Sequence, residues 1–375
     1  MSVGLVVLGV VLFVLLIIVH EAGHFIVARR NHVDVEEFGI FFPPRLWSRK
    51  TTAGWEFSIN LLPLGGFVRL KGEHDEDKGK GTYGSAKLGS KAKILLAGVT
   101  MNVVVAFLLL TLLGWVGLPK LINNQFTIKS DTHVSKNEIL IGSVIPGSPA
   151  AKAGLETTDQ LTKIISSSQK IYKVTSADNL PSITKSLAGQ TVTVDYTRDK
   201  QQHSERITLL SQKIVLASQK TKNPKGYLGI SPTQYTLYRY TWSSPVVALG
   251  ILKQFTVLTF KGLGSVVAGL ARGNTTQATS QVTGPVGIFE ILKDGSLLGY
   301  QFVLIIVAVI SLSLAIMNIL PIPALDGGKL FVTLVARVLR KKLTAKIENA
   351  LYGAGFALLI VLIILITIVD VRRNF

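Results

Sequence analysis

The sequence contains no cysteine among its 375 residues. This absence excludes a disulfide framework and any metal site built from thiolates. It is compatible with a domain outside the cytoplasm but does not require one.

Acidic residues are also scarce, because 22 Asp and Glu stand against 40 Lys and Arg, for a net charge of +18. Such an excess raises the question of nucleic acid as a partner. We expect none, because the basic residues cluster at 29–93 and 329–346, beside apolar segments. There they set membrane topology and attract anionic lipid. Both clusters are therefore expected in the cytoplasm, with both termini and the long segment 120–300 outside.

Hydrophobic residues make up 48% of the chain, and long apolar segments carry much of this share. Each is close to the roughly 20 residues that cross a bilayer as a helix. The first has no basic residue before it and no small-residue cleavage site after it, so we expect a retained span rather than a signal peptide. The four segments are about 3–27, 94–116, 302–320 and 351–369.

The sequence His20-Glu21-Ala22-Gly23-His24 closes the first apolar run, in which charge is expensive. Residues four apart lie on one face of a helix, so His20 and His24 can offer two imidazoles to one metal ion. Glu21 lies beside them, where it could take a proton from a metal-bound water. In a soluble helix this HExxH pattern indicates a zinc peptidase. In a membrane helix it indicates peptide-bond hydrolysis inside the bilayer.

Topology brings Asp326 to the same membrane face as the two histidines. The first and third spans both run inward, and the third ends in Asn318-Ile-Leu-Pro-Ile-Pro-Ala-Leu-Asp326-Gly-Gly. Catalytic zinc commonly has three protein ligands and a water. His20, His24 and Asp326 therefore form a candidate ligand set.

Other roles remain open for these polar residues. Asp-Gly is a turn signal, and Asp326 could equally cap a helix starting near Lys329. Pro321 and Pro323 break the helix, and unwound backbone at membrane depth is tolerated mainly where it lines a polar cavity, which favours a site. Asn318 could hydrogen-bond a bound peptide or simply pack against another helix.

The HEAGH motif and the NILPIPALDGG motif together resemble the site-2 protease family of intramembrane zinc metalloproteases, peptidase family M50. The likeness is strongest to bacterial RseP-type members with a PDZ domain. It extends to residues 63–68, to Gly98 and Asn102, and to 284–288. Two positions depart from the family pattern: Val99 follows Gly98 where Gly-Pro is usual, and Thr158 stands where a Gly-Asp pair usually begins.

The resemblance implies that Zn²⁺ is the cofactor and that Glu21 is the catalytic base. It implies further that His20, His24 and Asp326 are the zinc ligands, and that the substrates are single-span membrane proteins, already shortened by another protease. Examples in the family are anti-sigma factors and remnant signal peptides. The candidate substrate-binding residues are Asn318, Pro321, Pro323, Gly65, Gly66 and Phe67.

Two accessory parts are expected. Residues 55–61 alternate apolar and polar side chains, as in a strand with one buried face, and 67–70 is a candidate hairpin partner. Such a strand could pair with the substrate, or only cap the bundle. Residues 141–155 resemble the core of a PDZ domain. Such a domain could bind the clipped terminus of a substrate or exclude intact proteins by its bulk, and we favour this size filtering.

Residues 244–270 are apolar but interrupted by Lys253 and Lys261. A fifth span here would carry Asp326 to the face opposite His24, so we expect helices lying at the outer interface.

The sequence thus predicts a polytopic α-helical protein of the bacterial cytoplasmic (inner) membrane. It would have about four transmembrane helices, a membrane-associated β-hairpin and one extracytoplasmic PDZ-like β-rich domain. The expected parts are a first span with HExxH (1–30), a cytoplasmic or membrane-associated β segment (31–93), a second span (94–117), the PDZ-like domain (120–230), interfacial helices with a connector (231–298), a third span (300–322), the LDG loop with a cytoplasmic helix (323–350) and a fourth span (351–371).

The predicted function is that of a zinc metalloendopeptidase cutting within or near transmembrane segments. One alternative is a membrane-anchored zincin whose active site faces the cytosol and whose third ligand is a glutamate. The first glutamates after the motif, Glu36 and Glu37, are too close to it for that arrangement. The other is an inactive scaffold that holds membrane partners with its PDZ segment, against which the intact HExxH argues.

Overall fold

The computed structural model describes residues 3–219, 221, 224–274, 279, 282–341 and 343–374. The chain forms two compact units: Met1–Leu113 with Ser243–Phe375, and Gly114–Trp242. The first unit carries the long apolar helices and every candidate site residue. Its elements are α1 (Val3–Arg30), β1 (Val35–Lys50), β2 (Glu56–Leu70), α2 (Leu88–Val116), α6 (Ser244–Ala271), α8 (Pro285–Leu297), α9 (Tyr300–Ile319), α10 (Asp326–Val338) and α11 (Ala345–Asn374).

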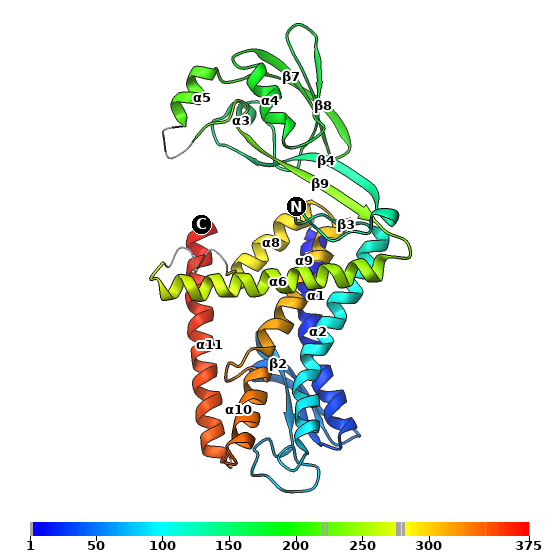
Figure 1. The fold of residues 1–375 in the computed structure, drawn as a ribbon, viewed down its shortest axis with the longest axis vertical. Coiled ribbons are helices and arrows are strands. Elements are labelled where there is room, and N and C mark those ends of the chain that lie inside the picture. The colour runs from blue at the N-terminus through cyan, green and yellow to red at the C-terminus, as the bar shows by residue number, and fades with distance from the viewer. Residues whose placement is uncertain are drawn as a thin grey trace. The chain divides into compact units, whose positions relative to one another are not determined.

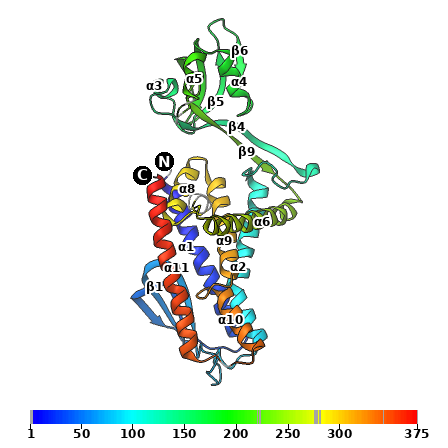
Figure 2. The same cartoon turned by 60° about the vertical axis from the view of Figure 1, so that its left-hand side comes forward.

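Five of the described helices are long and apolar enough to cross a membrane: α1, α2, α6, α9 and α11. These helices, together with the β structure, agree with a multi-pass membrane protein. In Figures 1 and 2 helix α6 runs crosswise to the other four. A helix lying at a membrane interface is expected to run in this direction. The count of four spans nevertheless stays a prediction, because α6 is also long and apolar enough to cross.

Small residues let α1 and α2 approach closely. A Cβ atom at Gly23 would lie 2.8 Å from the carbonyl oxygen of Ala97. In lipid no hydrophobic driving force brings helices together, so such close backbone packing is a main source of their association. The contact places the HEAGH turn of α1 directly against α2.

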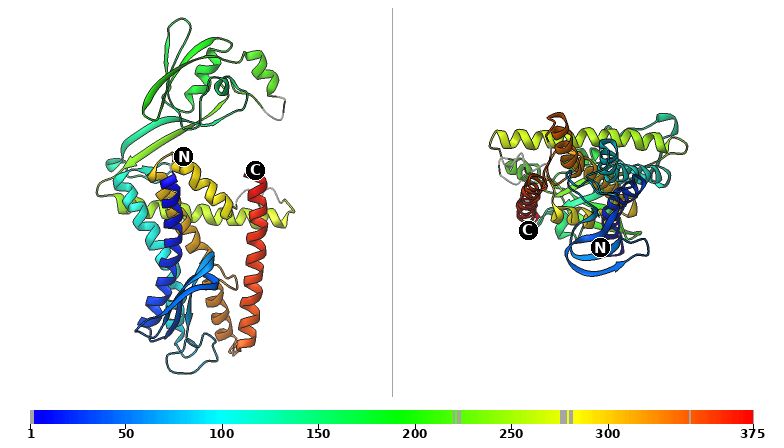
Figure 3. Two further views of the ribbon diagram at one scale, coloured as in Figure 1. Left: turned by 180° about the vertical axis from the view of Figure 1, so that it is seen from behind. Right: turned by 90° about the horizontal axis from the view of Figure 1, so that it is seen from below.

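The strands β1 and β2 each bend back, so their sheet consists of the segments 45–50, 56–60, 35–40 and 66–70 in that order across it. Figure 3 shows this sheet beside the second half of α1. The expected pairing of 67–70 with 55–61 is wrong, because 35–40 lies between them and pairs with both. The alternating pattern marks a strand with a buried face but not which segment lies next to it. In the described chain no further strand covers the outer edge of 66–70.

The second unit is a β-rich domain with its own core. Its strands lie in the order β3-β9-β4-β5-β7-β8, with β6 paired to β5, and every pair is antiparallel. In β7 the residues Val192, Val194 and Tyr196 are buried and alternate with less buried ones, as a sheet with one covered face requires. The elements are β3 (Leu118–Pro119), η1 (Lys129–Asp131), β4 (His133–Val144), α3 (Pro149–Lys152), β5 (Gln160–Ile165), β6 (Ile171–Lys173), α4 (Asn179–Ser186), β7 (Thr191–Arg198), β8 (Gln201–Thr208), α5 (Gln212–Ser218) and β9 (Ile230–Arg239).

The departure at Thr158 falls on a left-handed turn, where its φ is 75°. Its N–H donates to the carbonyl of Ile141 at 2.7 Å. The next residue, Asp159, is 1% exposed and accepts two hydrogen bonds of 2.7 Å from Arg198, whose pKa it raises. The surroundings therefore hold a β-branched residue in a conformation that favours glycine.

Thr158→Gly is accordingly expected to stabilise the second unit by about 0.5–1 kcal/mol, because glycine adopts this φ without steric strain. Differential scanning calorimetry of the protein in detergent would show a higher Tm for the β-rich unit. Thr157→Gly is the matched control: Thr157 is exposed and is not among the residues with positive φ, so its replacement should lower the Tm or leave it unchanged.

Candidate metal centre

Three side chains from two distant helices converge on one point. His20 and His24 lie one turn apart on α1, and their Nε2 atoms are 3.2 Å from each other. Asp326 is the first residue of α10, and its Oδ2 lies 3.1 Å from Nε2 of His20 and 3.2 Å from Nε2 of His24. Both histidines are 8% exposed. Within the described residues this is the one group of three such side chains close enough to share an ion.

The spacing of these atoms suits zinc. Zinc bonds to imidazole nitrogen and carboxylate oxygen are about 2.0–2.1 Å long, so neighbouring ligand atoms of a tetrahedral zinc are about 3.3 Å apart. The three ligand atoms observed here are 3.1–3.2 Å apart. The donor set of two imidazoles and one carboxylate leaves a fourth position for water, as catalytic zinc requires.

The far side of the His24 ring is held by the backbone of α2. Its Nδ1 lies 2.7 Å from the carbonyl oxygen of Ile94. A carbonyl can only accept, so Nδ1 carries the proton and the Nε2 lone pair is free for a metal. Nδ1 of His20 lies 3.1 Å from the side-chain amide of Asn102, also on α2.

The alternative role of Asp326 as a helix cap is excluded. Helix α10 begins at Asp326, and its N-cap is Leu325, with no side-chain capping bond. Gly327 and Gly328 let the first turn of α10 lie close against the preceding loop, because a Cβ at Gly328 would lie 1.9 Å from the carbonyl oxygen of Ile322. Pro321 precedes this fold and cannot continue α9. The loop thus directs the Asp326 carboxylate toward α1.

A cavity of about 600 Å³ joins the metal centre to most of the predicted substrate-binding residues. Glu21 faces it, and the sheet edge passes directly beside this glutamate, since a Cβ at Gly66 would lie 2.9 Å from Cγ of Glu21. Pro321 and Pro323 lie outside the lining; the Pro323 carbonyl instead packs against Gly355 of α11. The predicted residues that line the cavity are His20, Glu21, His24, Gly65, Gly66, Phe67, Asn318 and Asp326.

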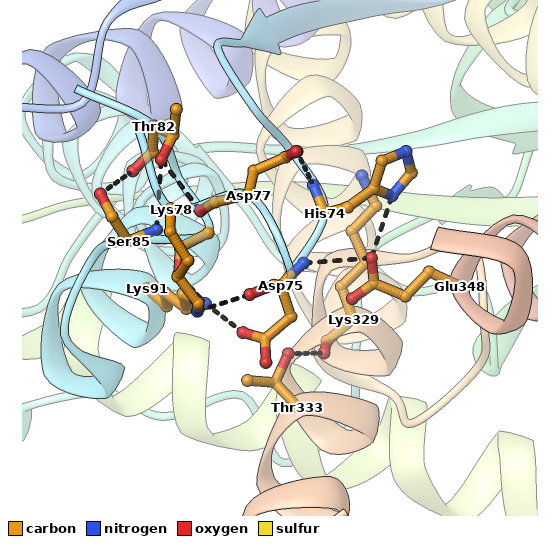
Figure 4. A network of polar contacts seen from close by, with 11 residues as sticks. His74, Asp75, Asp77, Lys78, Thr82, Ser85, Lys91, Lys329, Thr333 and Glu348 are labelled. Carbon is orange, nitrogen blue, oxygen red and sulfur yellow. Dashed lines mark hydrogen bonds and ion pairs between the residues drawn. The ribbon is translucent and has the colours of Figure 1, made fainter. Parts of the chain in front are cut away.

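Sequence reasoning did not anticipate a polar network (Figure 4), of which His74, Asp75 and Glu348 line this cavity. Glu348 of α11, 4% exposed, accepts a hydrogen bond from the backbone N–H of Asp75 at 3.3 Å. Nδ1 of His74 lies 3.0 Å from the same carboxylate oxygen. Lys91 of α2 pairs with the Asp75 side chain. The network ties the loop between β2 and α2 to α11. Its only sequence signal was an acidic residue, Glu348, just before the last apolar segment.

Gly98 gives the histidines their clearance, because a Cβ there would lie 2.4 Å from Nε2 of His24 and 2.6 Å from Nε2 of His20. Gly98→Ala is therefore expected to displace the ligand atoms and to lower both zinc content and activity at least about tenfold. A displacement of catalytic groups by about 1 Å can lower the rate about 100-fold. Metal analysis of purified protein would measure the loss. Gly89→Ala, on the same helix with nothing within 4 Å, should bind zinc normally. Equal zinc in both variants would contradict the packing described.

Known proteins resemble this chain along nearly its whole length. The family model for peptidase family M50 matches residues 8–362. A Clostridium perfringens protein named as a zinc metalloprotease is 30% identical over 374 residues, covering 98% of each chain. A Clostridium acetobutylicum protein named in the same way is 29% identical, covering 98% of this chain and 97% of its own. An Enterococcus faecalis protein named as the protease eep is 25% identical, covering 98% of each chain.

The expected family and the expected cofactor are thus confirmed, and the metal is zinc. The chain belongs to peptidase family M50, the site-2 protease family of membrane-embedded zinc metalloproteases.

Proposed function

We propose that this protein hydrolyses peptide bonds within or near the transmembrane segments of single-span membrane proteins. His20, His24 and Asp326 hold the zinc ion, and Glu21 is the catalytic base. The observation that carries the proposal is the convergence of three ligand atoms within 3.1–3.2 Å, beside Glu21, on a helix apolar enough to span a membrane. Charged groups at that depth are rarely retained without a function.

The residues divide the chemistry between them. Zinc at this centre would polarise the scissile carbonyl and lower the pKa of a water molecule. Glu21 accepts a proton from the attacking water at its carboxylate and passes it to the amine nitrogen of the leaving peptide. Ile94 holds His24 in the ligating tautomer. Both histidines are largely buried, and the lower local dielectric constant strengthens these electrostatic effects.

The substrate would be held in extended form along the outer edge of residues 66–70. Backbone groups there have no other strand beside them in the described chain, and Gly66 lies against Glu21. Pairing with this edge would unwind a helical segment, because a strand and a helix use the same backbone groups differently. Gly65, Gly66 and Phe67 are the proposed contacts on the sheet. The Asn318 amide, in the same cavity, is a proposed partner for the peptide backbone.

The proposed layout keeps α1, α2, α9 and α11 as spans and α6 at the outer interface of a bacterial cytoplasmic membrane. The β-rich unit is proposed to be a PDZ-like domain outside the cytoplasm that favours substrates already shortened by another protease. The basic clusters at 29–93 and 329–346 support this orientation.

The cytosolic zincin alternative is disfavoured by the state of its candidate ligand. Glu37 is 1% exposed, and its two oxygens pair with Arg45 at 2.9 Å and Arg69 at 2.8 Å. Both oxygens of Glu37 are therefore already paired within the sheet and are not free to bind a metal. The inactive-scaffold alternative would leave the close approach of His20, His24 and Asp326 without a use.

The test is the position of the cut. Purified protein in proteoliposomes would be given a single-span reporter truncated on its outer side, and the products would be mapped by mass spectrometry. We expect a cut within the apolar span or at its edge. Cleavage confined to soluble loops would indicate the zincin, and no cleavage of any reporter would indicate the scaffold; either result rejects the proposal.

A further inference from the structure

Three residues of α2 form one stripe behind the two histidines. Ile94, Gly98 and Asn102 are spaced four apart, so they lie on the same helix face. Ile94 supplies the carbonyl that holds His24, and Gly98 supplies the space for both rings. Asn102 occupies the corresponding place behind His20, with its amide nitrogen 3.1 Å from Nδ1.

The Asn102 amide has one group without a partner. The residue is 1% exposed, and in the described part of the chain its Oδ1 makes no hydrogen bond. The printed orientation of the amide is therefore one of two to be considered, since oxygen and nitrogen of an amide are assigned from their hydrogen bonds. Half a turn of the amide exchanges its oxygen and nitrogen, which puts Oδ1 at Nδ1 of His20.

Zinc ligation decides which orientation is needed. If the amide N–H donates to Nδ1, the ring proton must be on Nε2, which then cannot ligate a metal. If Oδ1 accepts from Nδ1–H, the Nε2 lone pair points toward Asp326, 3.1 Å away. The second arrangement pairs Oδ1 and moves the amide NH2 to the place that Oδ1 leaves, so zinc ligation rather than the number of hydrogen bonds favours it.

We propose that Asn102 is a positioning residue for the zinc site, whose Oδ1 accepts the Nδ1 proton of His20 and fixes the ligating tautomer. Its backbone is anchored as well, because Ser311 of α9, fully buried, donates from Oγ to the Asn102 carbonyl at 2.8 Å. Helix α9 leads into the loop that carries Asp326. Asn102 thus connects the orientation of one ligand with the helix that delivers another.

The test measures zinc affinity by competition with a chromophoric chelator, together with the visible spectrum of the cobalt-substituted protein. Asn102→Leu has a similar size but no acceptor, and it should bind zinc about 10–100-fold more weakly, the usual loss for a group behind a metal ligand. Asn102→Asp retains an acceptor and should bind zinc at least as tightly as the wild type. Thr100→Val, at an exposed position two residues away, should change neither affinity nor spectrum.

A purely structural role for Asn102 predicts the opposite order, because a buried carboxylate disturbs packing at least as much as leucine does. Wild-type affinity in folded Asn102→Leu, or weak binding by Asn102→Asp, would overturn the proposal. If Asn102→Leu does not fold, the affinity of Asn102→Asp decides alone. The proposal rests on the zinc site of the proposed function, but the two fail differently. Normal zinc binding by every Asn102 variant rejects only the role of Asn102, whereas a wild-type protein without zinc rejects the proposed function.

Discussion

Replacing Glu21 with glutamine is expected to reduce cleavage of a single-span reporter by about 10²–10⁴-fold while zinc content stays at the wild-type level. Glutamine has nearly the same shape but cannot accept a proton from water, and general-base catalysis is worth about that factor. Glu21 faces the cavity but is not among the three converging ligand atoms, so its loss should not release the metal. Initial cleavage rates and metal analysis on one preparation would measure both quantities.

The matched control is Glu205→Gln, which removes an exposed carboxylate from β8 of the β-rich unit. It should leave both cleavage and zinc unchanged. If Glu21→Gln cut the reporter at the wild-type rate, Glu21 would not be the base. If it lost zinc, Glu21 would belong to the metal site rather than to the proton transfer.

Replacing Asp326 with alanine is expected to remove zinc and activity together. Asp326 supplies the only carboxylate oxygen in the described three-residue group, 3.1 and 3.2 Å from the two imidazoles. Without it two neutral nitrogens remain, fewer than catalytic zinc sites use. Zinc affinity should therefore fall by more than the roughly 10–100-fold that follows loss of a group behind a ligand.

Asp294→Ala is the corresponding control, since Asp294 is exposed on α8. It should keep full zinc content and full activity. Wild-type zinc in Asp326→Ala would remove Asp326 from the ligand set. The loss of both metal and fold would be distinguished from simple ligand loss by the Tm of the first unit, which in the variant should equal that of the zinc-free wild type.

Much of this centre could be predicted from the sequence, because its strongest signals are local. The four-residue spacing of His20 and His24 follows from helix geometry, and their depth follows from the apolar run before them. Asp326 is distant in sequence, yet the direction of the spans was enough to bring it to the correct end of the bundle. The structure places all three side chains together.

The supporting contacts could not be predicted, because they depend on how helices and strands pack side by side. Ile94 contributes through a backbone carbonyl, which any residue would provide. Asn102 was noted only as part of a family element, since nothing in its sequence position indicates a histidine neighbour. The edge at 66–70 was assigned the wrong partner strand, because alternation fixes which face is buried and not the order of strands.

X-ray absorption spectroscopy at the zinc edge of the purified wild-type protein tests the central claim most directly. The account predicts one zinc per chain with nitrogen and oxygen ligands at about 2.0–2.1 Å, outer-shell scattering from two imidazoles and no sulfur. Scattering from two imidazoles should persist in Glu21→Gln. A site with three imidazoles, or with none, would contradict a centre built from His20, His24 and Asp326.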